Sequence, residues 1–354
     1  ENGKELLLFD PASFREGKTV DYLARVSDDG SRILMLISEA GSDLGDINGD
    51  GIADIIISAQ YADYNGRVNC GTSYVIYGRN RHSSFGSMSL QNWITSPTTG
   101  FRIFGAGDSH MSGFSVRGAG DVNGDGIKDI IVGSRGATAW SKDGAGSATI
   151  IYGHNQTSPA FVDIDLLSFV PSPSLGFQVF GAAAGDACGT SVSGAGDVNG
   201  DGLADVIVGA TQASPASRTS AGASCVIYGA NYIGLPSSQP SSQPSRQPSR
   251  QPTSQPSRQP TSQPTVQPSL KFSEIGDVDL RYLSKSKGFT IAGAVANDQS
   301  GFTVSDAGDV NGDGFGDVII GAPYAATNYG TSYVIFGRNT SSAVNFDLLT
   351  MVTG

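Results

Sequence analysis

The stretch GDVNGDGIKD at residues 120–129 has three nearly identical further copies in this 354-residue chain. The other copies are GDINGDGIAD at residues 45–54, GDVNGDGLAD at residues 196–205 and GDVNGDGFGD at residues 308–317. Their first aspartates are residues 46, 121, 197 and 309, so the copies follow one another at steps of 75, 76 and 112 residues. A motif that returns at such a period indicates a fold built from repeated units.

A proline-rich insertion explains the last step, which exceeds the one before it by 36 residues (112 − 76). In residues 236–269, proline recurs within a Ser/Thr-x-Gln-Pro pattern that contains almost nothing apolar. Recurrent proline removes backbone donors and favours extended polyproline II structure. We therefore expect a disordered spacer within the third repeat, rather than a ligand for proline-recognising domains.

The residues around each acidic motif predict short β-strands. A β-branched run follows every copy, for example residues 130–132, and such a run is typical of a strand buried on both faces. A further strand ends immediately before a glycine, as at residues 148–152, and a Gly-Phe segment, as at residues 176–181, leads to the strand before the next motif. Four short strands in about 75 residues are the unit of a propeller blade. We predict an all-β fold, a β-propeller of four-stranded antiparallel blades in one domain, with repeats at about residues 20–99, 100–175, 176–287 and 288–354.

The acidic motif has the oxygen donors of a calcium site. In the pattern DxNxDGxxD, side-chain oxygens at positions one, three and five converge when the chain curls tightly, and glycine at positions four and six permits that curl. Position seven offers its backbone carbonyl and the aspartate at position nine completes an all-oxygen set, which favours Ca²⁺ over Mg²⁺, zinc or copper. We expect about four Ca²⁺ ions, one for each loop. The predicted ligands are Asp46, Asn48, Asp50, Ile52, Asp54, Asp121, Asn123, Asp125, Ile127, Asp129, Asp197, Asn199, Asp201, Leu203, Asp205, Asp309, Asn311, Asp313, Phe315 and Asp317.

Two other interpretations of the motif are weaker. An EF-hand or dockerin loop begins in the same way but requires an acidic residue at position twelve, where this chain has Ile57, Val132, Val208 and Ile320. The motif is therefore placed at a turn between two strands. An Asx-rich turn without metal is the other interpretation, but three carboxylates in one tight loop repel each other strongly without a cation.

The fourth repeat carries the clearest family resemblance. Residues 301–337, GFTVSDAGDVNGDGFGDVIIGAPYAATNYGTSYVIFG, resemble the FG-GAP repeat of the integrin α-subunit β-propeller, including the Gly-Phe pair at 301–302 and Gly-Ala-Pro at 321–323. The second and third repeats are slightly altered copies, and the first keeps the acidic loop without a clear Phe-Gly pair. The resemblance covers nearly the whole chain outside the proline-rich insertion.

The resemblance also implies where a ligand would bind. In integrin propellers the calcium loops join the first and second strands of a blade on one face, and loops on the opposite face engage ligands. The corresponding loops here are residues 60–71, 134–146, 211–222 and 322–330, with loops such as residues 106–112. In these loops the candidate ligand-binding aromatic residues are Tyr61, Tyr64, Trp140 and Tyr324. For each of them, packing is the more common role.

The sequence leaves the number of blades open. Integrin propellers have more and shorter blades, with calcium in only some, whereas this chain has four longer repeats with an acidic loop in each. The chain stops at Thr353-Gly354, where the next Gly-Phe segment would begin. It is therefore either part of a larger propeller or a closed four-blade ring in which residues 20–26 supply the missing outer strand of the last blade.

Composition and charge exclude several classes of protein. The formal net charge is −11 with only 22 Lys and Arg residues, so the clustered cations of a nucleic-acid surface are missing. No stretch reaches the roughly 18–20 apolar residues of a membrane helix, so membrane attachment would need segments outside this chain. Asn155 and Asn339 begin candidate N-glycosylation sequons, which fit a secreted or cell-surface location on the extracellular side. We expect buried thiols at Cys70, Cys188 and Cys225, and the alternative is a single disulfide between two of them.

We expect a calcium-binding extracellular or cell-surface adhesion or recognition module similar to an integrin α head. Calcium would be structural, and an extracellular protein or glycan would bind the opposite face. A partner subunit is left open. The alternative is a calcium-dependent glycan-binding, lectin-like module or a non-catalytic module of an extracellular enzyme.

The sequence does not favour an enzyme. The three histidines, His82, His110 and His154, are not repeated and none is near a GxSxG-like nucleophile. His110 is interpreted as a solvated loop residue. Pairs of aspartates recur in successive repeats, which predicts a structural turn rather than glycosidase carboxylates. These aspartates are Asp163 with Asp165, Asp277 with Asp279, and Asp347.

Overall fold

A computed structural model describes residues 44–78, 95–155, 162–230, 277–339 and 345–351, with short pieces at residues 6–7, 23–24, 35–36, 87–88 and 90. Within these ranges the regular secondary structure is almost entirely β-strand, with one large sheet for each acidic motif. The all-β fold class predicted from the sequence is confirmed. No helix in this part of the chain is long and apolar enough to span a membrane. The proline-rich insertion and His82 lie outside the described residues.

The second sheet shows the plan of the repeat. β8 (Ser112–Gly120) leads into the acidic loop and β9 (Asp129–Ser134) leaves it, and β10 (Ser147–Ile151) and β12 (Gly176–Phe180) continue the antiparallel order. The four strands predicted for a repeat are therefore present. β16 (Val278–Asp279) adds a short parallel strand beside β12, which the sequence did not reveal because two residues carry no periodic pattern.

The other large sheets follow the same order. The first sheet runs β11 (Ile164–Asp165), β7 (Gly100–Phe104), β5 (Thr72–Ile76) and β4 (Ile55–Ala59). The third runs β13 (Cys188–Gly196), β14 (Asp205–Ala210), β15 (Ala223–Ile227), β17 (Gly288–Ala292) and β21 (Phe346–Asp347). The fourth runs β18 (Thr303–Gly308), β19 (Asp317–Ala322) and β20 (Thr331–Ile335).

Two short strand pairs lie outside these sheets. β1 (Leu6–Leu7) pairs with β6 (Ser87–Met88), and β2 (Leu23–Ala24) pairs with β3 (Met35–Leu36). Of residues 20–26, expected in a closed ring to supply an outer strand of the last repeat, only residues 23–24 are described, and they pair with β3. The closed ring therefore stays a prediction. Short helices complete the described elements, namely η3 (Leu166–Ser168), η4 (Pro215–Ser217), η6 (Leu280–Tyr282), α1 (Ala325–Asn328) and α2 (Leu348–Met351).

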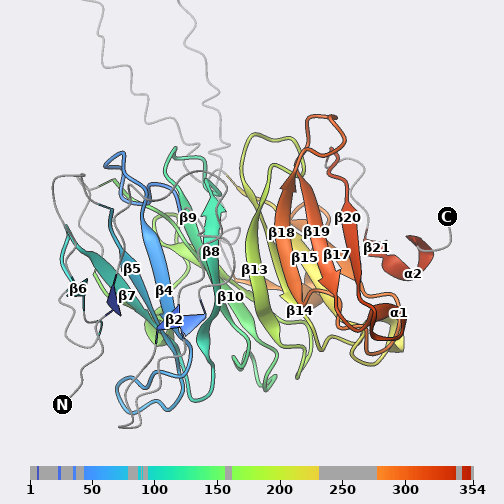
Figure 1. Ribbon diagram of the computed structural model, residues 1–354, viewed down its shortest axis with the longest axis horizontal. Helices are drawn as coiled ribbons and strands as arrows, with labels where there is room; N and C mark the ends of the chain where they lie inside the picture. Colours follow the sequence, from blue (N-terminus) through green and yellow to red (C-terminus); the bar gives the residue numbers. More distant parts are fainter. Residues whose placement is uncertain are drawn as a thin grey trace, which may run out of the picture.

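The large sheets stack against one another in chain order, from blue to red in Figure 1. β4 lies against β8, β8 against β13, and β13 against β18. Among the described strands, no pairing joins the fourth sheet to the first, so hydrogen bonding between these strands does not close the stack.

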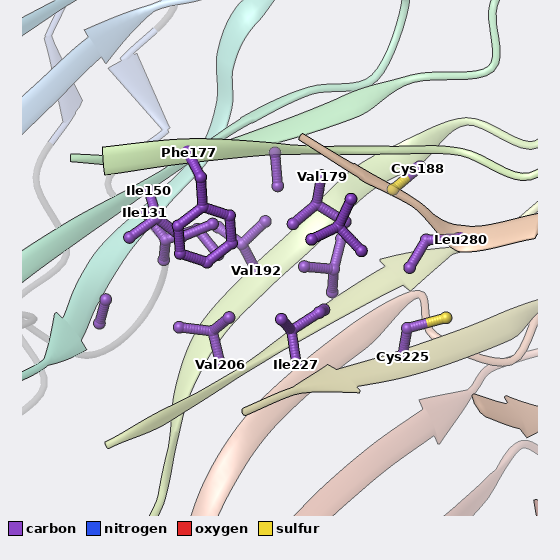
Figure 2. Close-up of a cluster of buried hydrophobic side chains, with 14 of the residues drawn as sticks. Ile131, Ile150, Phe177, Val179, Cys188, Val192, Val206, Cys225, Ile227 and Leu280 are labelled. Carbon is purple, nitrogen blue, oxygen red and sulfur yellow. The ribbon is translucent and has the colours of Figure 1, made fainter. Parts of the chain in front are cut away.

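Each interface between sheets is filled by apolar residues of both neighbours. Between the second and third sheets, Ile131, Ile150 and Phe177 meet Val206 and Ile227 (Figure 2). All five side chains are at most 5 % exposed. Both faces of β9 and β14 are consequently buried, as their β-branched runs predicted. Burial of one such side chain stabilises the fold by about 1.5–3 kcal/mol, so these interfaces hold the stack together.

The three cysteines are free and buried, which confirms the expected buried thiols. Burial raises the pKa of Cys225 to about 12 and raises the pKa of Cys188 well above its ordinary value. Both thiols lie in the interface between the second and third sheets (Figure 2), where they stay protonated and pack as small apolar groups.

Candidate functional site

Each acidic motif forms a tight loop that its own first aspartate closes. In the third loop, Oδ1 of Asp197 accepts hydrogen bonds from the amides of Gly200 and Asp201 at 2.7 and 3.0 Å, and Oδ2 accepts one from Gly202 at 2.8 Å. Gly200 and Gly202 have φ angles of 75° and 88°, a left-handed conformation that strains residues with a side chain. The tight curl predicted from glycine at positions four and six is therefore present.

The side chains at positions three and five face the same loop. Oδ1 of Asn199 accepts from the amide of Asp201 at 2.8 Å, and Nδ2 of Asn199 donates to Oδ2 of Asp201 at 2.9 Å. Oδ1 of Asp201 accepts from the amide of Leu203, at position seven, at 2.9 Å. The other three loops repeat this pattern. The structure thus brings the predicted ligands at positions one, three and five together in every loop.

The aspartate at position nine ties the loop to its sheet. Asp205 is buried, and its two oxygens accept from two backbone amides at 2.9 and 2.8 Å. These are the amides of Val198, at position two, and of Gly229, two residues after the end of β15. Sequence reasoning missed this role, although a glycine stands 24 residues after position nine in each of the first three repeats. The equivalent aspartates, with the same two bonds, are Asp54, Asp129 and Asp317.

The environment of this aspartate disfavours its negative charge. The pKa of Asp129 is raised to about 8 by burial first and by the charges of Asp125 and Asp121, although the amides of Gly153 and Val122 oppose the shift. The same causes raise the pKa of the first loop's position-nine aspartate to about 7 and that of the third loop's to about 8. A positive charge bound to the loop would offset this effect.

The carboxylates of the loops are directed to backbone amides in this structure. Within the described ranges, no group of three or more His, Cys, Asp or Glu side chains converges as a metal site would require. Positions one and five accept from amides of the loop, and position nine accepts from position two and from the glycine after the third strand. In each loop the side-chain oxygens of positions one, three and five therefore lie close together. Both carboxylate oxygens of position nine accept hydrogen bonds from backbone amides.

The acidic loops also join neighbouring repeats. The carbonyl of Asp121 accepts from the amide of Ala204, in the next loop, at 2.9 Å, and the carbonyl of Val122 accepts from Ala230 at 3.0 Å. The first and third loops make equivalent bonds to the repeats that follow them. A change in one loop therefore acts directly on the next sheet.

The loops at the opposite strand ends pair with one another. The amide of Ser109 donates to the carbonyl of Val68 at 2.8 Å and that of Met111 donates to Asn69 at 3.1 Å. Equivalent bonds recur in the second and third repeats. These are the loops that the resemblance implicates in ligand binding, and together they form a hydrogen-bonded layer away from the acidic loops.

The four candidate aromatic residues differ in exposure. Tyr61, Trp140 and Tyr324 are 40, 56 and 48 % exposed. Tyr64 is half-buried, and its ring stacks on Phe104 with a centroid distance of 3.5 Å. Tyr64 is consequently held by packing. Trp140 packs edge-on against Phe180 at a centroid distance of 4.8 Å, but like Tyr61 and Tyr324 it presents surface to solvent.

A cation in each of the first three of these loops binds an aspartate of the short parallel strand, β11, β16 or β21, that pairs with the Gly-Phe strand of the same sheet. Arg67 makes two hydrogen bonds to Asp165, at 2.7 and 2.8 Å, and Asp165 also caps η3 through the amide of Leu167 at 3.0 Å. The prediction that the recurring aspartates are structural turn residues is confirmed. Sequence reasoning missed the cations, although each stands four residues before a glycine that ends its loop. The equivalent ion pairs are Lys142–Asp279 at 3.2 Å and Arg218–Asp347 at 2.9 Å.

Replacing Arg67 with Met is expected to lower the free energy of unfolding by about 1–3 kcal/mol, because Asp165 would keep a partly buried charge without its partner. The measurement is urea unfolding of the whole chain. Lys285→Met, at an exposed position, is the matched control and should leave stability unchanged. Equal stability of the two variants would show that the ion pair contributes nothing.

His110 is not the solvated residue that the sequence predicted. It is half-buried, its carbonyl accepts from the amide of Gly136 at 3.1 Å, and its Nε2 accepts from the amide of Thr138 at 3.4 Å. Burial lowers its pKa. The prediction failed because the sequence does not show which loop of the next repeat packs against residues 106–112.

The two candidate glycosylation sites lie at the strand ends that carry the acidic loops. Asn155 and Asn339 are both exposed, and each stands two residues after the glycine that binds the position-nine aspartate, Gly153 or Gly337. Their modification stays a prediction.

Comparison with protein families agrees with this geometry. The FG-GAP repeat family model matches residues 41–76, 112–151, 189–227 and 302–335, and each match contains one acidic loop and the strands after it. The chain contains four FG-GAP repeats. FG-GAP repeats are typical of integrin α-subunits and of extracellular recognition modules, in agreement with the resemblance seen in the fourth repeat.

The insertion in the third FG-GAP repeat has a match of its own. Residues 236–270 match the PT disordered repeat family, which supports the proline-rich linker predicted for residues 236–269. A comparison with curated proteins found no significant match.

Proposed function

We propose that this protein with four FG-GAP repeats is a calcium-binding adhesion or recognition module that works on the extracellular side, similar to an integrin α head. The stacked sheets are blades of a β-propeller. Structural Ca²⁺ occupies the acidic loops, and a protein or glycan ligand binds the loops at the other strand ends. The observation that carries the proposal is the acidic loop itself, repeated four times with three aspartates and an asparagine in nine residues.

The donor chemistry of the loops fits Ca²⁺. Asp197, Asn199 and Asp201 lie around one turn, and the residue at position five is exposed to solvent in all four loops, so a cation has access. Burial first, and then the charges of Asp201 and Asp197, raise the pKa of Asp205, and a cation bound in the loop would oppose this shift. When bound, Ca²⁺ would offset the repulsion between the carboxylates and stabilise the hairpin between the first two strands of each blade.

The opposite strand ends suit recognition of a macromolecule. Their loops are held by hydrogen bonds to one another and by the ion pairs of Arg67, Lys142 and Arg218. Binding a ligand would therefore cost little conformational entropy of these loops. Trp140 presents an exposed aromatic surface on this layer, and such residues contribute strongly to protein and glycan interfaces.

Removing calcium is expected to lower the melting temperature of the protein. At a free Ca²⁺ concentration of about 100 times the dissociation constant, one site contributes roughly 2.7 kcal/mol of stability. Loss of Ca²⁺ from one loop should also weaken the next repeat, because the loops are hydrogen-bonded to it. Melting is measured in EDTA and after adding back Ca²⁺ or Mg²⁺, and calorimetric titration counts the ions, with about four expected.

Recovery with Ca²⁺ and weaker recovery with Mg²⁺ support the proposal. The calcium account is wrong if chelation leaves the melting temperature unchanged and titration detects no binding. Binding to cells and to a glycan array then tests the ligand surface. Trp140→Ser should reduce binding there and lower the melting temperature only slightly, because the ring is 56 % exposed and only packs edge-on against Phe180. Equal binding by this variant would remove Trp140 from the ligand surface.

A further inference from the structure

Asn-Gly dipeptides occur in two different environments in the described part of the chain. Four of them stand at positions three and four of the acidic loops, and another is Asn65-Gly66, in the loop of residues 60–71. One more, Asn2-Gly3, lies outside the described residues. Asparagine before glycine is the asparagine whose side-chain amide is lost most readily, because no side chain on the next residue shields the backbone nitrogen that attacks it.

In the acidic loops both reacting groups are held by hydrogen bonds. Oδ1 of Asn123 accepts from the amide of Asp125, and Nδ2 donates to Oδ2 of Asp125, both at 3.0 Å. The amide of Gly124, which would have to attack, donates to Oδ1 of Asp121 at 2.7 Å. The same two side-chain bonds are made by Asn48, Asn199 and Asn311, and all but Asn311 of the four asparagines are at most 3 % exposed. Loss of the amide there requires the loop to open first.

Asn65-Gly66 forms an exposed turn instead. The two residues have φ angles of 50° and 82°, a conformation for which Asn-Gly is the preferred pair in a two-residue hairpin turn. Hydrogen bonds of 3.1 and 3.0 Å between Tyr64 and Arg67 close the turn. Both central residues are exposed, and a Cβ atom at Gly66 would have no neighbour within 4 Å. No described residue bonds to the side chain of Asn65 or the amide of Gly66, so both reacting groups are open to water.

The geometry points to Asn65 as a site of spontaneous deamidation in the folded protein. The backbone nitrogen of Gly66 gives its proton to hydroxide and forms a bond to Cγ of Asn65. The Cγ–Nδ2 bond then breaks, and the amide nitrogen leaves as ammonia after taking a proton from water. Water opens the resulting five-membered imide at Cγ, which gives aspartate, or at the backbone carbonyl carbon, which gives isoaspartate.

The modification changes a loop of the layer to which the proposed function assigns ligand binding. Either product places a new carboxylate two residues before Arg67, whose partner is Asp165. Isoaspartate also lengthens the backbone between the paired residues of the turn. The equivalent turns, Trp140-Ser141 and Ala216-Ser217, have the same positive φ angles but no asparagine. Of these three turns only the first can react, and the reaction itself depends neither on calcium nor on the ligand.

The test incubates the whole folded chain, with Ca²⁺ present, at mildly alkaline pH and physiological temperature. Tryptic digestion and mass spectrometry follow the conversion with time. Asn48 and Asn65 share the tryptic peptide between Arg32 and Arg67, so fragmentation of one peptide compares the two environments. Conversion at Asn65 is expected to be about tenfold or more faster than at Asn48, because the acidic loop must open before it can react.

Two controls accompany this measurement. In the chain unfolded by urea, Asn48 and Asn65 should convert at similar rates, because the protection of the loop is lost. Asn65→Gly, which suits the same turn, should leave conversion at Asn48 alone in this peptide.

Three results would overturn the inference. One is conversion at Asn65 that is no faster than at Asn48 in the folded chain. Another is the same ratio of rates in the unfolded chain, because the flanking sequence and not the structure would then set the difference. The last is conversion at Asn65 that is tenfold or more slower in the folded chain than in the unfolded chain, because the turn would then protect its asparagine. Failure of the calcium proposal appears on chelation and is therefore distinguishable.

Discussion

Replacing Asp205 with Ala is expected to lower the free energy of unfolding by about 2–6 kcal/mol. Asp205 is buried, and its carboxylate accepts from the amides of Val198 and Gly229 at 2.9 and 2.8 Å. The substitution leaves two buried amides without an acceptor, and each such loss costs about 1–3 kcal/mol. Urea unfolding followed by intrinsic fluorescence measures the effect.

The control for this variant distinguishes loss of the hydrogen bonds that Asp205 makes to the backbone from loss of Ca²⁺ binding. Asp201, at position five of the same loop, is exposed, and its oxygens bond only within the loop. In Ca²⁺ both Asp201→Ala and Asp205→Ala should be less stable than the native chain. In EDTA the Asp205 variant should remain strongly destabilised, whereas the Asp201 variant should nearly match the native chain. Equal stability of Asp205→Ala and the native chain in EDTA would show that the hydrogen bonds to Asp205 do not stabilise the fold.

Replacing Gly222 with Ala is expected to lower the free energy of unfolding by about 2–5 kcal/mol. The φ angle of Gly222 is 80°, a conformation that costs a residue with a side chain about 1–2 kcal/mol. In addition, a Cβ atom at this position would lie 2.1 Å from the carbonyl oxygen and 2.4 Å from the nitrogen of Ser300, so the backbone must separate. Overpacking of this kind adds about 1–3 kcal/mol.

Gly330 is the matched control because it holds the same place in the fourth repeat. Its φ angle is 77°, but the nearest atom to an added Cβ is the carbonyl oxygen of Pro323 at 3.4 Å. Gly330→Ala should therefore lower stability by only about 1–2 kcal/mol, the strain of the conformation alone. Thermal unfolding of the two variants side by side measures the difference, and equal losses would show that the contact with Ser300 does not matter.

Much of the fold follows from short-range pattern. The β-branched runs after each acidic motif are buried strands, and the glycines at positions four and six of the third loop have the left-handed conformation that its tight turn needs. These features depend on neighbours within a few residues, so one repeat is enough to reveal them. The two-residue strand β16 was not predicted, because it is defined only by its pairing with β12, about a hundred residues away in the chain.

In the candidate site, too, some features follow from the local sequence and others depend on distant parts of the chain. That positions one, three and five face one turn could be predicted, since their hydrogen bonds are made within the loop. The second partner of Asp205 is Gly229, on the far side of a hairpin, and no local rule identifies it. The pairing of Arg67 with Asp165 and the burial of His110 likewise depend on loops that meet only after the sheets have stacked.

The acidic loop and its period determined, without any structure, an all-β repeat protein with FG-GAP repeats, because oxygen donors, glycine and strand residues stand at fixed short spacings. The same sequence makes Gly222 and Gly330, or Ile207 and Ile319, look equivalent. Only the tertiary structure separates them, because the third sheet is covered by the fourth and no described sheet covers the face of the fourth sheet that carries Ile319. Burial and close backbone approach are properties of an interface between sheets, and a local pattern contains no information about whether the neighbouring sheet is there.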